Sequence, residues 1–387
     1  MFEIKLLNKI SPAGLEKLDN SKYRCADDSE NPDAIMVRSA AMHEMEFGKK
    51  LKAIARAGAG VNNIPIERCS ENGIVVFNTP GANANAVKEL VLAALLLSSR
   101  KIVQGINWTK TLKGKGDEVG KLVEKGKSQF AGPEIAGKKL GVIGLGAIGI
   151  LVANIGCRLG MEVYGYDPYI SVEGAWGLSR SVKHAKSLKE IFENCDYISV
   201  HVPLTPETKG LVNSESIKLM KKDVRILNFA RGELAVAEDI KAGIEEGRIA
   251  CYATDFPTEE LIDVEGVLTI PHLGASTPES EDNCAKMAAV ELVGYLEYGN
   301  IKNSVNLPDA EMPYTGDTRV TIIHKNIPNM LTQISSAFSG ANANIDNLIN
   351  KSKKDYAYTM IDLSGEVEAQ VIENLKKIEG VIRVRVI

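Results

Sequence analysis

Short apolar runs alternate along the first part of the chain with stretches whose apolar residues recur every three or four positions. The short runs predict β-strands, and the longer period predicts amphipathic helices. Four strand-like runs occur at 2–7, 34–39, 52–58 and 74–79, and a long helical pattern follows near 84–105. Because strands and helices alternate, we expect an α/β fold with a parallel sheet covered by helices.

A second series of strand-like runs fills the middle of the chain, and most of them end in a polar residue. These runs cover 138–144, 162–167, 197–203, 224–231, 249–255 and 267–272. In an open parallel sheet, ligands bind at the carboxyl ends of the strands, so these terminal residues are expected to converge on one crevice. A helical pattern at 279–300 follows, and the polar segment 303–317 is interpreted as a linker.

The last part of the chain, residues 318–387, has a pattern of its own. It predicts strand, helix, strand, strand, helix and strand, at 318–325, 329–342, 344–353, 356–365, 367–378 and 381–387. The order β-α-β-β-α-β is that of a ferredoxin-like unit. We therefore expect a separate small domain at this end of the chain.

Length and charge narrow the classes of protein. The chain has 387 residues, which predicts two or three domains, and its net charge of −4 does not suggest nucleic acid or an anionic membrane as a partner. Charged residues interrupt the N-terminal 18 residues, unlike a signal peptide, and the longest apolar run, 91–97, is too short to cross a bilayer. The six cysteines are scattered without a CxxC pair, so we expect a cytoplasmic protein without disulfides or a metal site.

A GxGxxG motif, formed by Gly144, Gly146 and Gly149, lies between a strand-like run and a helical pattern. Such glycines let the backbone approach a pyrophosphate at the helix N-terminus, where free amides and the helix dipole favour an anion. The next strand-like run ends in Asp167, an acceptor for the ribose hydroxyls of adenosine. No Arg or Lys follows closely to neutralise a 2′-phosphate, so we expect NAD rather than NADP as the cofactor.

Hydride transfer to a nicotinamide needs a proton acceptor, and histidine has a suitable pKa. His272 ends a strand-like run and is the candidate acid–base, whereas His201 is expected to line the cofactor. The segment 255–261 carries carboxylates that can fix the histidine tautomer. Arg231, at another strand end, has the planar fork that grips the carboxylate of a 2-hydroxy acid. The alternatives are a structural role of His272 in a turn, and a helix-capping role or a surface salt bridge of Arg231.

These residues resemble the D-isomer-specific 2-hydroxyacid dehydrogenases, from about residue 35 to residue 308. The motifs that carry the resemblance are RAGAGVNNI, NTPGANANAVKEL, GLGAIG, YDP, HVPLTPETKGLVN, NFARGELA, DFPTEE and PHLGAST. The resemblance implies a Rossmann-type nucleotide domain inserted in a flavodoxin-like substrate domain, and the tail looks like an ACT regulatory domain of ferredoxin-like fold. The implied domains are 1–98 with 284–307 for the substrate, 99–283 for NAD, a linker at 308–317 and an ACT-like domain at 318–387.

The resemblance also implies roles for single residues. Arg231 binds the substrate carboxylate, His272 is the acid–base, and a glutamate of DFPTEE is its partner. This segment is one residue shorter than the family pattern, so counting from the aspartate selects Glu260, which we prefer, and aligning on PTE selects Glu259. Cofactor contacts are expected from Thr79, Gly144, Gly146, Ala147, Ile148, Gly149, Asp167, His201, Val202, Pro203, Phe229, Ala230, Arg231, Asp255, His272, Gly274 and Ala275.

Together with the ACT-like tail, the resemblance implies 3-phosphoglycerate as the substrate, oxidised at its hydroxyl-bearing carbon. The loop RAGAGVNN would present Arg56, Gly58 and Asn62, and Arg38 and Arg56 are the candidates for the phosphate. A surface ion pair is the alternative role for Arg38. Two other functions stay open: a dehydrogenase for an unphosphorylated acid such as glycerate, glyoxylate or lactate, and a non-catalytic NAD-sensing protein.

The tail segment HKNIPNML resembles the ACT effector loop, and His324, Asn326 and Asn344 are candidates for binding L-serine. Asn329 stands where the family usually has glycine, and asparagine tolerates the left-handed conformation that such a turn needs. The departure leaves open an assembly unit without an effector. Two such units can pair through edge strands, so we expect a homodimer or homotetramer.

Overall fold

The computed structural model describes residues 1–314, 318–341 and 343–387. The last three residues of the predicted linker and the last residue of the predicted helix 329–342 lie outside these ranges. The chain divides into two compact units: unit 1 is Met1–Asn83 with Thr277–Ile387, and unit 2 is Ala84–Ser276. No helix in the described ranges is both long enough and apolar enough to cross a membrane.

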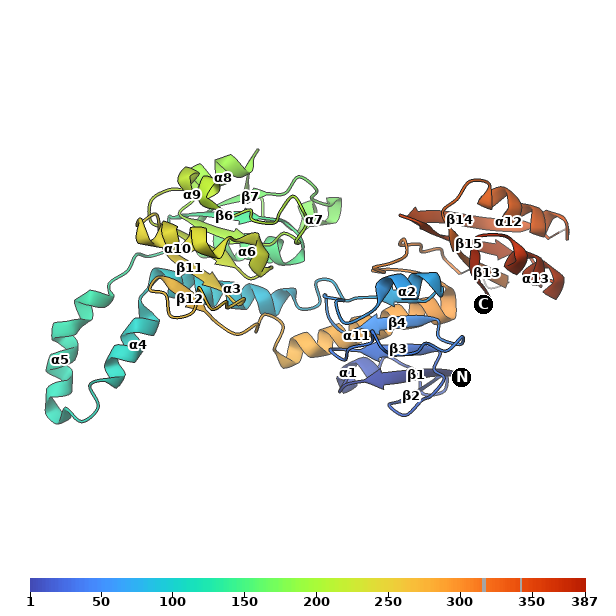
Figure 1. The fold of residues 1–387 in the computed structure, drawn as a ribbon, viewed down its shortest axis with the longest axis horizontal. Coiled ribbons are helices and arrows are strands. Elements are labelled where there is room, and N and C mark those ends of the chain that lie inside the picture. Colours follow the sequence, from blue (N-terminus) through green and yellow to red (C-terminus); the bar gives the residue numbers. More distant parts are fainter. Residues whose placement is uncertain (315–317, 342) are drawn as a thin grey trace. The chain divides into compact units, whose positions relative to one another are not determined.

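Unit 1 contains a five-stranded parallel sheet in the order β2-β1-β3-β4-β5, which is the flavodoxin-like order. Its strands are β1 (Phe2–Leu7), β2 (Tyr23–Ala26), β3 (Ala34–Val37), β4 (Ala53–Arg56) and β5 (Val75–Phe77). The helices of this part are α1 (Pro12–Leu15), α2 (Ile66–Glu71) and α11 (Pro278–Tyr298). Apolar residues of β1, β3 and β4 form one core with α11, and the opposite face packs on the segment that includes α2 (Figure 1).

The long helix α11 has sequence signals at both ends. The Thr277 side chain accepts a hydrogen bond from the Ser280 amide, and Pro278 occupies the first turn, where a missing N–H costs nothing. At the other end Gly299 adopts a left-handed conformation, with φ of 69°, and its amide donates to the Tyr295 carbonyl. The helix therefore begins one residue before the predicted helical stretch 279–300 and ends two residues before its end.

Unit 2 contains a seven-stranded parallel sheet in the order β12-β11-β10-β9-β6-β7-β8. Its strands are β6 (Lys139–Ile143), β7 (Glu162–Tyr166), β8 (Lys183–His184), β9 (Tyr197–Val200), β10 (Val224–Asn228), β11 (Ile249–Thr254) and β12 (Val267–Thr269). The main helices are α3 (Ala84–Ser99), α6 (Ala147–Arg158), α7 (Val172–Gly177), α8 (Leu188–Asn194), α9 (Ser214–Leu219) and α10 (Ala237–Glu245). Two separate apolar cores, one containing α3 and α6 and the other α8, α9 and α10, cover the sheet, so the predicted Rossmann-type fold is confirmed.

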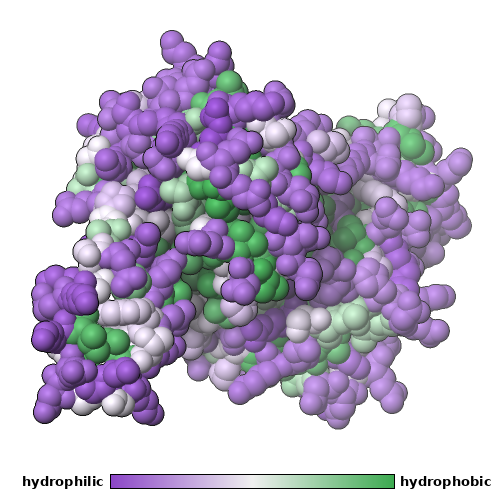
Figure 2. Space-filling model, turned by 60° about the vertical axis from the view of Figure 1, so that its left-hand side comes forward, coloured by the Kyte–Doolittle hydropathy of each residue, from purple (hydrophilic) through white to green (hydrophobic). Residues whose placement is uncertain are grey.

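A helical hairpin follows α3 and extends away from the rest of unit 2 (Figure 1). It consists of α4 (Ile102–Lys110) and α5 (Val119–Gly126), joined and followed by the short 3₁₀ turns η1 (Gly116–Glu118) and η2 (Lys127–Phe130). Neither α4 nor α5 contains a buried residue, and Ile102, Val103 and Ile106 are exposed. The surface is otherwise mostly hydrophilic, with apolar patches between the charged groups (Figure 2). The predicted continuous helical pattern 84–105 is therefore interrupted near Arg100.

The C-terminal tail folds as predicted into a β-α-β-β-α-β unit. Its elements are β13 (Thr318–Lys325), α12 (Met330–Ser339), β14 (Ile345–Lys353), β15 (Tyr356–Leu363), α13 (Ala369–Lys377) and β16 (Val381–Val386). The strands form an antiparallel sheet in the order β14-β15-β13-β16. One face carries α12 and α13, whereas Ile323, Tyr358 and Met360 on the other face join the core that contains α11. The tail therefore shares a core with the first sheet.

A buried arginine fixes the start of the tail. The Arg319 side chain is fully buried, and its guanidinium binds both carboxylate oxygens of Asp362, at 2.6 and 2.8 Å. It also donates to the carbonyls of Tyr298, Met312 and Pro313. Two backbone segments and the Asp362 carboxylate thus meet at one cation, and the described part of the predicted linker is held in place rather than left solvated.

Candidate active site

The glycine-rich turn between β6 and α6 has the shape that a dinucleotide requires. Gly144 has a φ of 90°, and a Cβ on Gly149 would lie 1.9 Å from the Gly144 carbonyl oxygen. Only glycine fits these two positions. By contrast, nothing in the described structure lies within 4 Å of the position that a Cβ on Gly146 would occupy, so the backbone there is open to a ligand.

The N-terminus of α6 is suited to an anion. The helix begins at Ala147, no side chain caps it, and its first turn has no acidic residue. The first amides therefore retain their donors, and the helix dipole adds a partial positive charge. These features fit the pyrophosphate of NAD, and Ala147, Ile148 and Gly149 all lie in this turn.

Asp167, directly after β7, is held against the same turn. Its Oδ2 accepts a hydrogen bond from the Leu145 amide and its Oδ1 accepts one from the Tyr169 amide, both at 2.8 Å. The carboxylate thus lies at the edge of the glycine-rich loop. Its contact with the ribose hydroxyls of the cofactor stays a prediction.

His201 follows β9, and its environment keeps the imidazole neutral. Its Nε2 lies 2.7 Å from the Ser199 hydroxyl, and within the described ranges its buried Nδ1 has no partner. Burial lowers the pKa of His201 to about 4, so the ring carries no charge near neutral pH. A neutral imidazole suits the predicted cofactor-lining role. Ser199 was not predicted, although it lies two positions earlier, on the same face of the strand.

Asp255, His272 and Arg231 converge beyond the ends of β11, β12 and β10. Asp255 is 2% exposed, and burial raises the pKa of its carboxyl, opposed by the nearby charges of His272 and Arg231 and by the Gly274 amide. The ring of Phe256 meets the His272 imidazole edge to face, with centroids 4.9 Å apart. The sequence assigned Asp255 only to the cofactor, whereas the structure also makes it an electrostatic partner of His272.

The two glutamates predicted as partners of His272, Glu259 and Glu260, lie in the segment after β11. The pKa of Glu260 is lowered by its own backbone amide and by the Thr258 hydroxyl, so its carboxylate faces its own turn. Across the described ranges, no hydrogen bond or ion pair joins Glu259 or Glu260 to His272. The pairing of His272 with a glutamate stays a prediction.

Arg231 lies on the surface of unit 2 with its backbone anchored. Its carbonyl accepts a hydrogen bond from Asn228 Nδ2 at 2.9 Å, and its Nη1 donates to the Ala230 carbonyl. In the part of the chain that the structure describes, it forms no ion pair, so most of its donors stay available for a carboxylate. Other predicted cofactor contacts occupy the same strand-end segments: Val202, Pro203, Phe229, Ala230, Gly274 and Ala275.

In unit 1, the loop after β4 presents an arginine without an acidic partner. Arg56 Nε donates to the Arg38 carbonyl at 3.0 Å, and no carboxylate of the described ranges pairs with the guanidinium. Gly58 has a φ of 148°, and a Cβ there would lie 1.9 Å from Arg56 Nη1. The glycine thus makes room for the guanidinium, whose burial lowers its pKa. An unpaired, partly buried cation is suited to bind an anionic ligand.

The other predicted residues of unit 1 have different surroundings. Arg38 Nη2 pairs with Glu281 Oε1 at 2.6 Å, which is the surface ion pair considered as its alternative role. The Asn62 carbonyl accepts a hydrogen bond from His43 Nε2. Thr79 is fully buried, its amide donates to the Gly58 carbonyl, and its hydroxyl has no partner within the described ranges.

The three candidate effector residues do not converge within one chain. His324 is buried: its Nδ1 donates to the Lys325 carbonyl and its Nε2 lies 2.9 Å from the Thr359 hydroxyl. The amides of Asn326 and Asn344 donate to the Lys354 carbonyl and to Asp346. Asn329 adopts the left-handed conformation, with φ of 67°, that the sequence predicted it would tolerate.

Comparison with known proteins identifies the family. The profile described as "D-isomer specific 2-hydroxyacid dehydrogenase, NAD binding domain" matches residues 92–274. D-3-phosphoglycerate dehydrogenase of Haemophilus influenzae is 32% identical over 355 residues, which cover 89% of this chain and 83% of the relative. The chain belongs to the D-isomer-specific 2-hydroxyacid dehydrogenase family. It is therefore an NAD-dependent oxidoreductase, as the sequence predicted.

Further relatives show how far the likeness extends. D-3-phosphoglycerate dehydrogenase of Methanocaldococcus jannaschii is 35% identical over 313 residues, 78% of this chain but 57% of the relative. The chain thus spans little more than half the length of that protein. The NAD⁺-bound 3-phosphoglycerate dehydrogenase of Entamoeba histolytica matches with a TM-score of 0.61 and 29% identity, covering 79% of this chain and 98% of the other. A D-lactate dehydrogenase of Treponema pallidum, 19% identical with a TM-score of 0.66, shares the fold.

Proposed function

We propose that this family member oxidises 3-phospho-D-glycerate at C2 to 3-phosphohydroxypyruvate, the entry step of phosphorylated serine synthesis. The main support is the match to the Haemophilus influenzae enzyme, which extends over 355 residues and so over most of both units. The unpaired Arg56 supplies the fixed cation that a phosphorylated substrate needs.

The glycine-rich turn and the uncapped N-terminus of α6 would hold NAD, which would supply the hydride acceptor for C2 of the substrate. In the proposed reaction His272 takes the proton of the C2 hydroxyl, and the negative charge of Asp255 stabilises the imidazolium that forms. Arg231 grips the substrate carboxylate through its fork of donors, and Arg56 binds the phosphate. The buried position of Asp255 and its electrostatic interactions with His272 and Arg231 support these roles.

A panel of 2-oxo acids with NADH tests the proposal. The expected result is fast turnover of 3-phosphohydroxypyruvate and slow turnover of hydroxypyruvate, glyoxylate and pyruvate. Faster turnover of an unphosphorylated acid would favour a glycerate, glyoxylate or lactate enzyme. NAD binding without turnover of any acid would favour the NAD-sensing protein.

We also propose the predicted domain organisation, with two adjustments: the NAD domain ends at Ser276, because α11 belongs wholly to unit 1, and the first boundary moves as well. The predicted substrate domain covers 1–98 and 284–307, the NAD domain 99–283, and the ACT-like domain 318–387. The helix α3 packs on α6, β10 and β11, which favours moving the boundary from the end of this helix to its beginning. Limited proteolysis with and without NAD, followed by mass spectrometry, would locate the boundaries.

We propose that the chain forms at least a dimer. The strand β14 is an edge of the tail sheet, and within the described ranges no other strand pairs with its outer side. Exposed edges of this length are normally covered. Three exposed apolar side chains of α4, those of Ile102, Val103 and Ile106, offer a second contact surface. Light scattering after size exclusion tests the assembly, and a monomer at micromolar concentration would contradict it.

L-serine is the proposed effector of the ACT-like tail, bound near His324, Asn326 and Asn344 of paired tails. A ligand shared by two tails would resist the domain motions that turnover needs, so we expect a lower kcat rather than a higher KM. Calorimetry of serine should use the full chain, because one face of the tail sheet packs in the core of unit 1. Absence of heat from a folded dimer would leave the tail as an assembly unit.

A further inference from the structure

Two arginines start from the same edge of the first sheet. Arg38 directly follows β3, Arg56 is the last residue of β4, and the register of these neighbouring parallel strands pairs Val37 with Arg56. Arg56 Nε donates a hydrogen bond to the Arg38 carbonyl at 3.0 Å. Both side chains therefore begin at the carboxyl ends of the strands, where parallel sheets bind their ligands.

The two guanidinium groups differ in their partners. Arg38 Nη2 lies 2.6 Å from Glu281 Oε1, in the first turn of α11, whereas Arg56 forms no ion pair within the described ranges. Burial is the main cause that lowers the pKa of Arg56, and the positive charge of Arg38 lowers it further. The two cations are thus close enough to repel each other, and Glu281 neutralises one of them.

The ion pair between Arg38 and Glu281 is accessible to solvent. The side chains of the two residues are 43% and 42% exposed. Exposed pairs of this kind contribute little to stability and open readily, because water and salt ions compete for both charges. An anion that approaches Arg56 can therefore compete with Glu281 for the guanidinium of Arg38.

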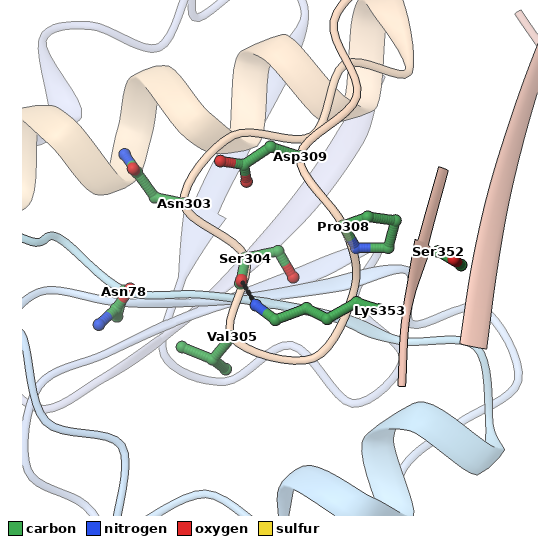
Figure 3. A pocket seen from close by; sticks show the side chains of 8 residues that line it. All are labelled: Asn78, Asn303, Ser304, Val305, Pro308, Asp309, Ser352 and Lys353. Atoms are coloured by element: carbon green, nitrogen blue, oxygen red, sulfur yellow. Dashed lines mark hydrogen bonds between the residues drawn. The ribbon is translucent and has the colours of Figure 1, made fainter. Parts of the chain in front are cut away.

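Another cation of unit 1 is already engaged. Asn78, whose side chain donates to the Ala59 carbonyl in the loop after β4, lines a cavity together with Lys353 (Figure 3). The lysine extends across this cavity and donates to the Ser304 carbonyl at 2.8 Å. Arg38 is therefore the better candidate for a second cation at this edge of the sheet.

We propose that Glu281 is a specificity-determining residue, which occupies Arg38 and so limits how tightly the chain binds a phosphorylated acid. The inference rests on the proposed function, in which Arg56 binds the phosphate. While the ion pair is closed, the phosphate interacts with Arg56 alone. When the pair opens, the phosphate gains a second guanidinium, which doubles the fixed positive charge that faces it.

The size of the effect follows from the strength of the ion pair. The apparent affinity of a ligand falls with the fraction of the protein that is competent to bind it, and an exposed ion pair shifts such an equilibrium by a factor of up to about five. Removing the charge of Glu281 should therefore lower the KM and the Kd for 3-phospho-D-glycerate roughly fivefold. D-glycerate has no phosphate and should gain nothing.

The variant Glu281→Gln tests the proposal, because it keeps the shape of the side chain and removes its charge. Initial rates give the KM, and calorimetry of the full chain gives the Kd, each for 3-phospho-D-glycerate and for D-glycerate. Glu279→Gln is the matched control: it removes the same charge from the same turn of α11, and Glu279 forms no ion pair or hydrogen bond within the described ranges. Adding Arg38→Met to Glu281→Gln should abolish the gain.

Three results would overturn the proposal: an unchanged KM and Kd in Glu281→Gln, an equal gain in Glu279→Gln, or a gain that persists when Arg38→Met is added. Failure of the proposed function gives a different result. The unmodified chain would then bind and oxidise D-glycerate at least as well as 3-phospho-D-glycerate, and Arg56→Met would change neither. Absence of both binding and turnover of 3-phospho-D-glycerate, in the unmodified chain and in Glu281→Gln, would refute both.

Discussion

Replacing Gly58 with alanine is expected to disable the cationic loop of unit 1. The φ of 148° at this position is one that side chains rarely adopt, and the new Cβ would lie 1.9 Å from Arg56 Nη1 and 2.7 Å from Cζ. Both distances are far below van der Waals contact, so the guanidinium must leave its place. The alanine thereby displaces the Arg56 guanidinium from the ligand, while the arginine keeps its positive charge.

The size of the effect follows from the interaction that is lost. A hydrogen bond to a charged group contributes about 1.5–3 kcal/mol, and each 1.4 kcal/mol corresponds to about a factor of ten. We therefore expect the KM for 3-phospho-D-glycerate to rise roughly 10- to 150-fold. Arg56→Met should give a rise of the same order without the backbone strain, which separates loss of the cation from distortion of the loop.

Initial rates of NADH formation at saturating NAD measure this KM, and fluorescence titration measures NAD affinity separately. Arg38→Met is the matched control, because that guanidinium already pairs with Glu281, and its KM should change much less. A KM within threefold of the unmodified chain in both Gly58→Ala and Arg56→Met would refute the assignment of the phosphate to Arg56. A larger rise of this KM in Arg38→Met than in Arg56→Met would assign the phosphate to Arg38 instead.

Three further predictions concern other groups. His272→Ala should lower kcat at least ~10²-fold with NAD affinity unchanged, and near-normal turnover would remove this residue from the reaction. Asp167→Ala should weaken NAD and narrow its advantage over NADP in paired titrations, whereas a native preference for NADP would contradict the role of the carboxylate. The raised pKa of Glu291, about 8 against 4.5, means that the folded chain loses stability as pH rises through this window. Glu291→Gln lacks that loss, so its thermal midpoint relative to the unmodified chain should be higher at pH 8.5 than at pH 5.5, and a difference independent of pH would refute the assignment.

The residues at strand ends could be placed from the sequence because apolar runs mark buried strands clearly. Asp167, His201 and Asp255 follow their strands directly, and Arg231 comes three residues after β10. Parallel strands bring their carboxyl ends to one edge. The short strands β2 and β8 were missed, since YRCA and KH carry no extended apolar pattern. The break between α3 and α4 was missed as well, because the apolar period continues across it.

Side-chain partners could not be predicted in the same way. Whether Arg38 or Arg56 is free depends on Glu281, which is distant in sequence and lies on α11. The burial of Arg319 was equally hidden, because its partners are backbone carbonyls and an aspartate on another strand. Such pairings depend on how elements pack, and one sequence without relatives carries no local signal for them.

The measurement that tests the central claim most directly is the ratio of kcat/KM for 3-phospho-D-glycerate to that for D-glycerate, with NAD as the oxidant. A site that holds the phosphate with a fixed cation should favour the phosphorylated acid by roughly 10²-fold or more, because the analogue leaves that cation unpaired. We predict this preference, and we expect Arg56→Met to reduce it. An equal or higher value for D-glycerate, or NADH formation from neither acid, would contradict it.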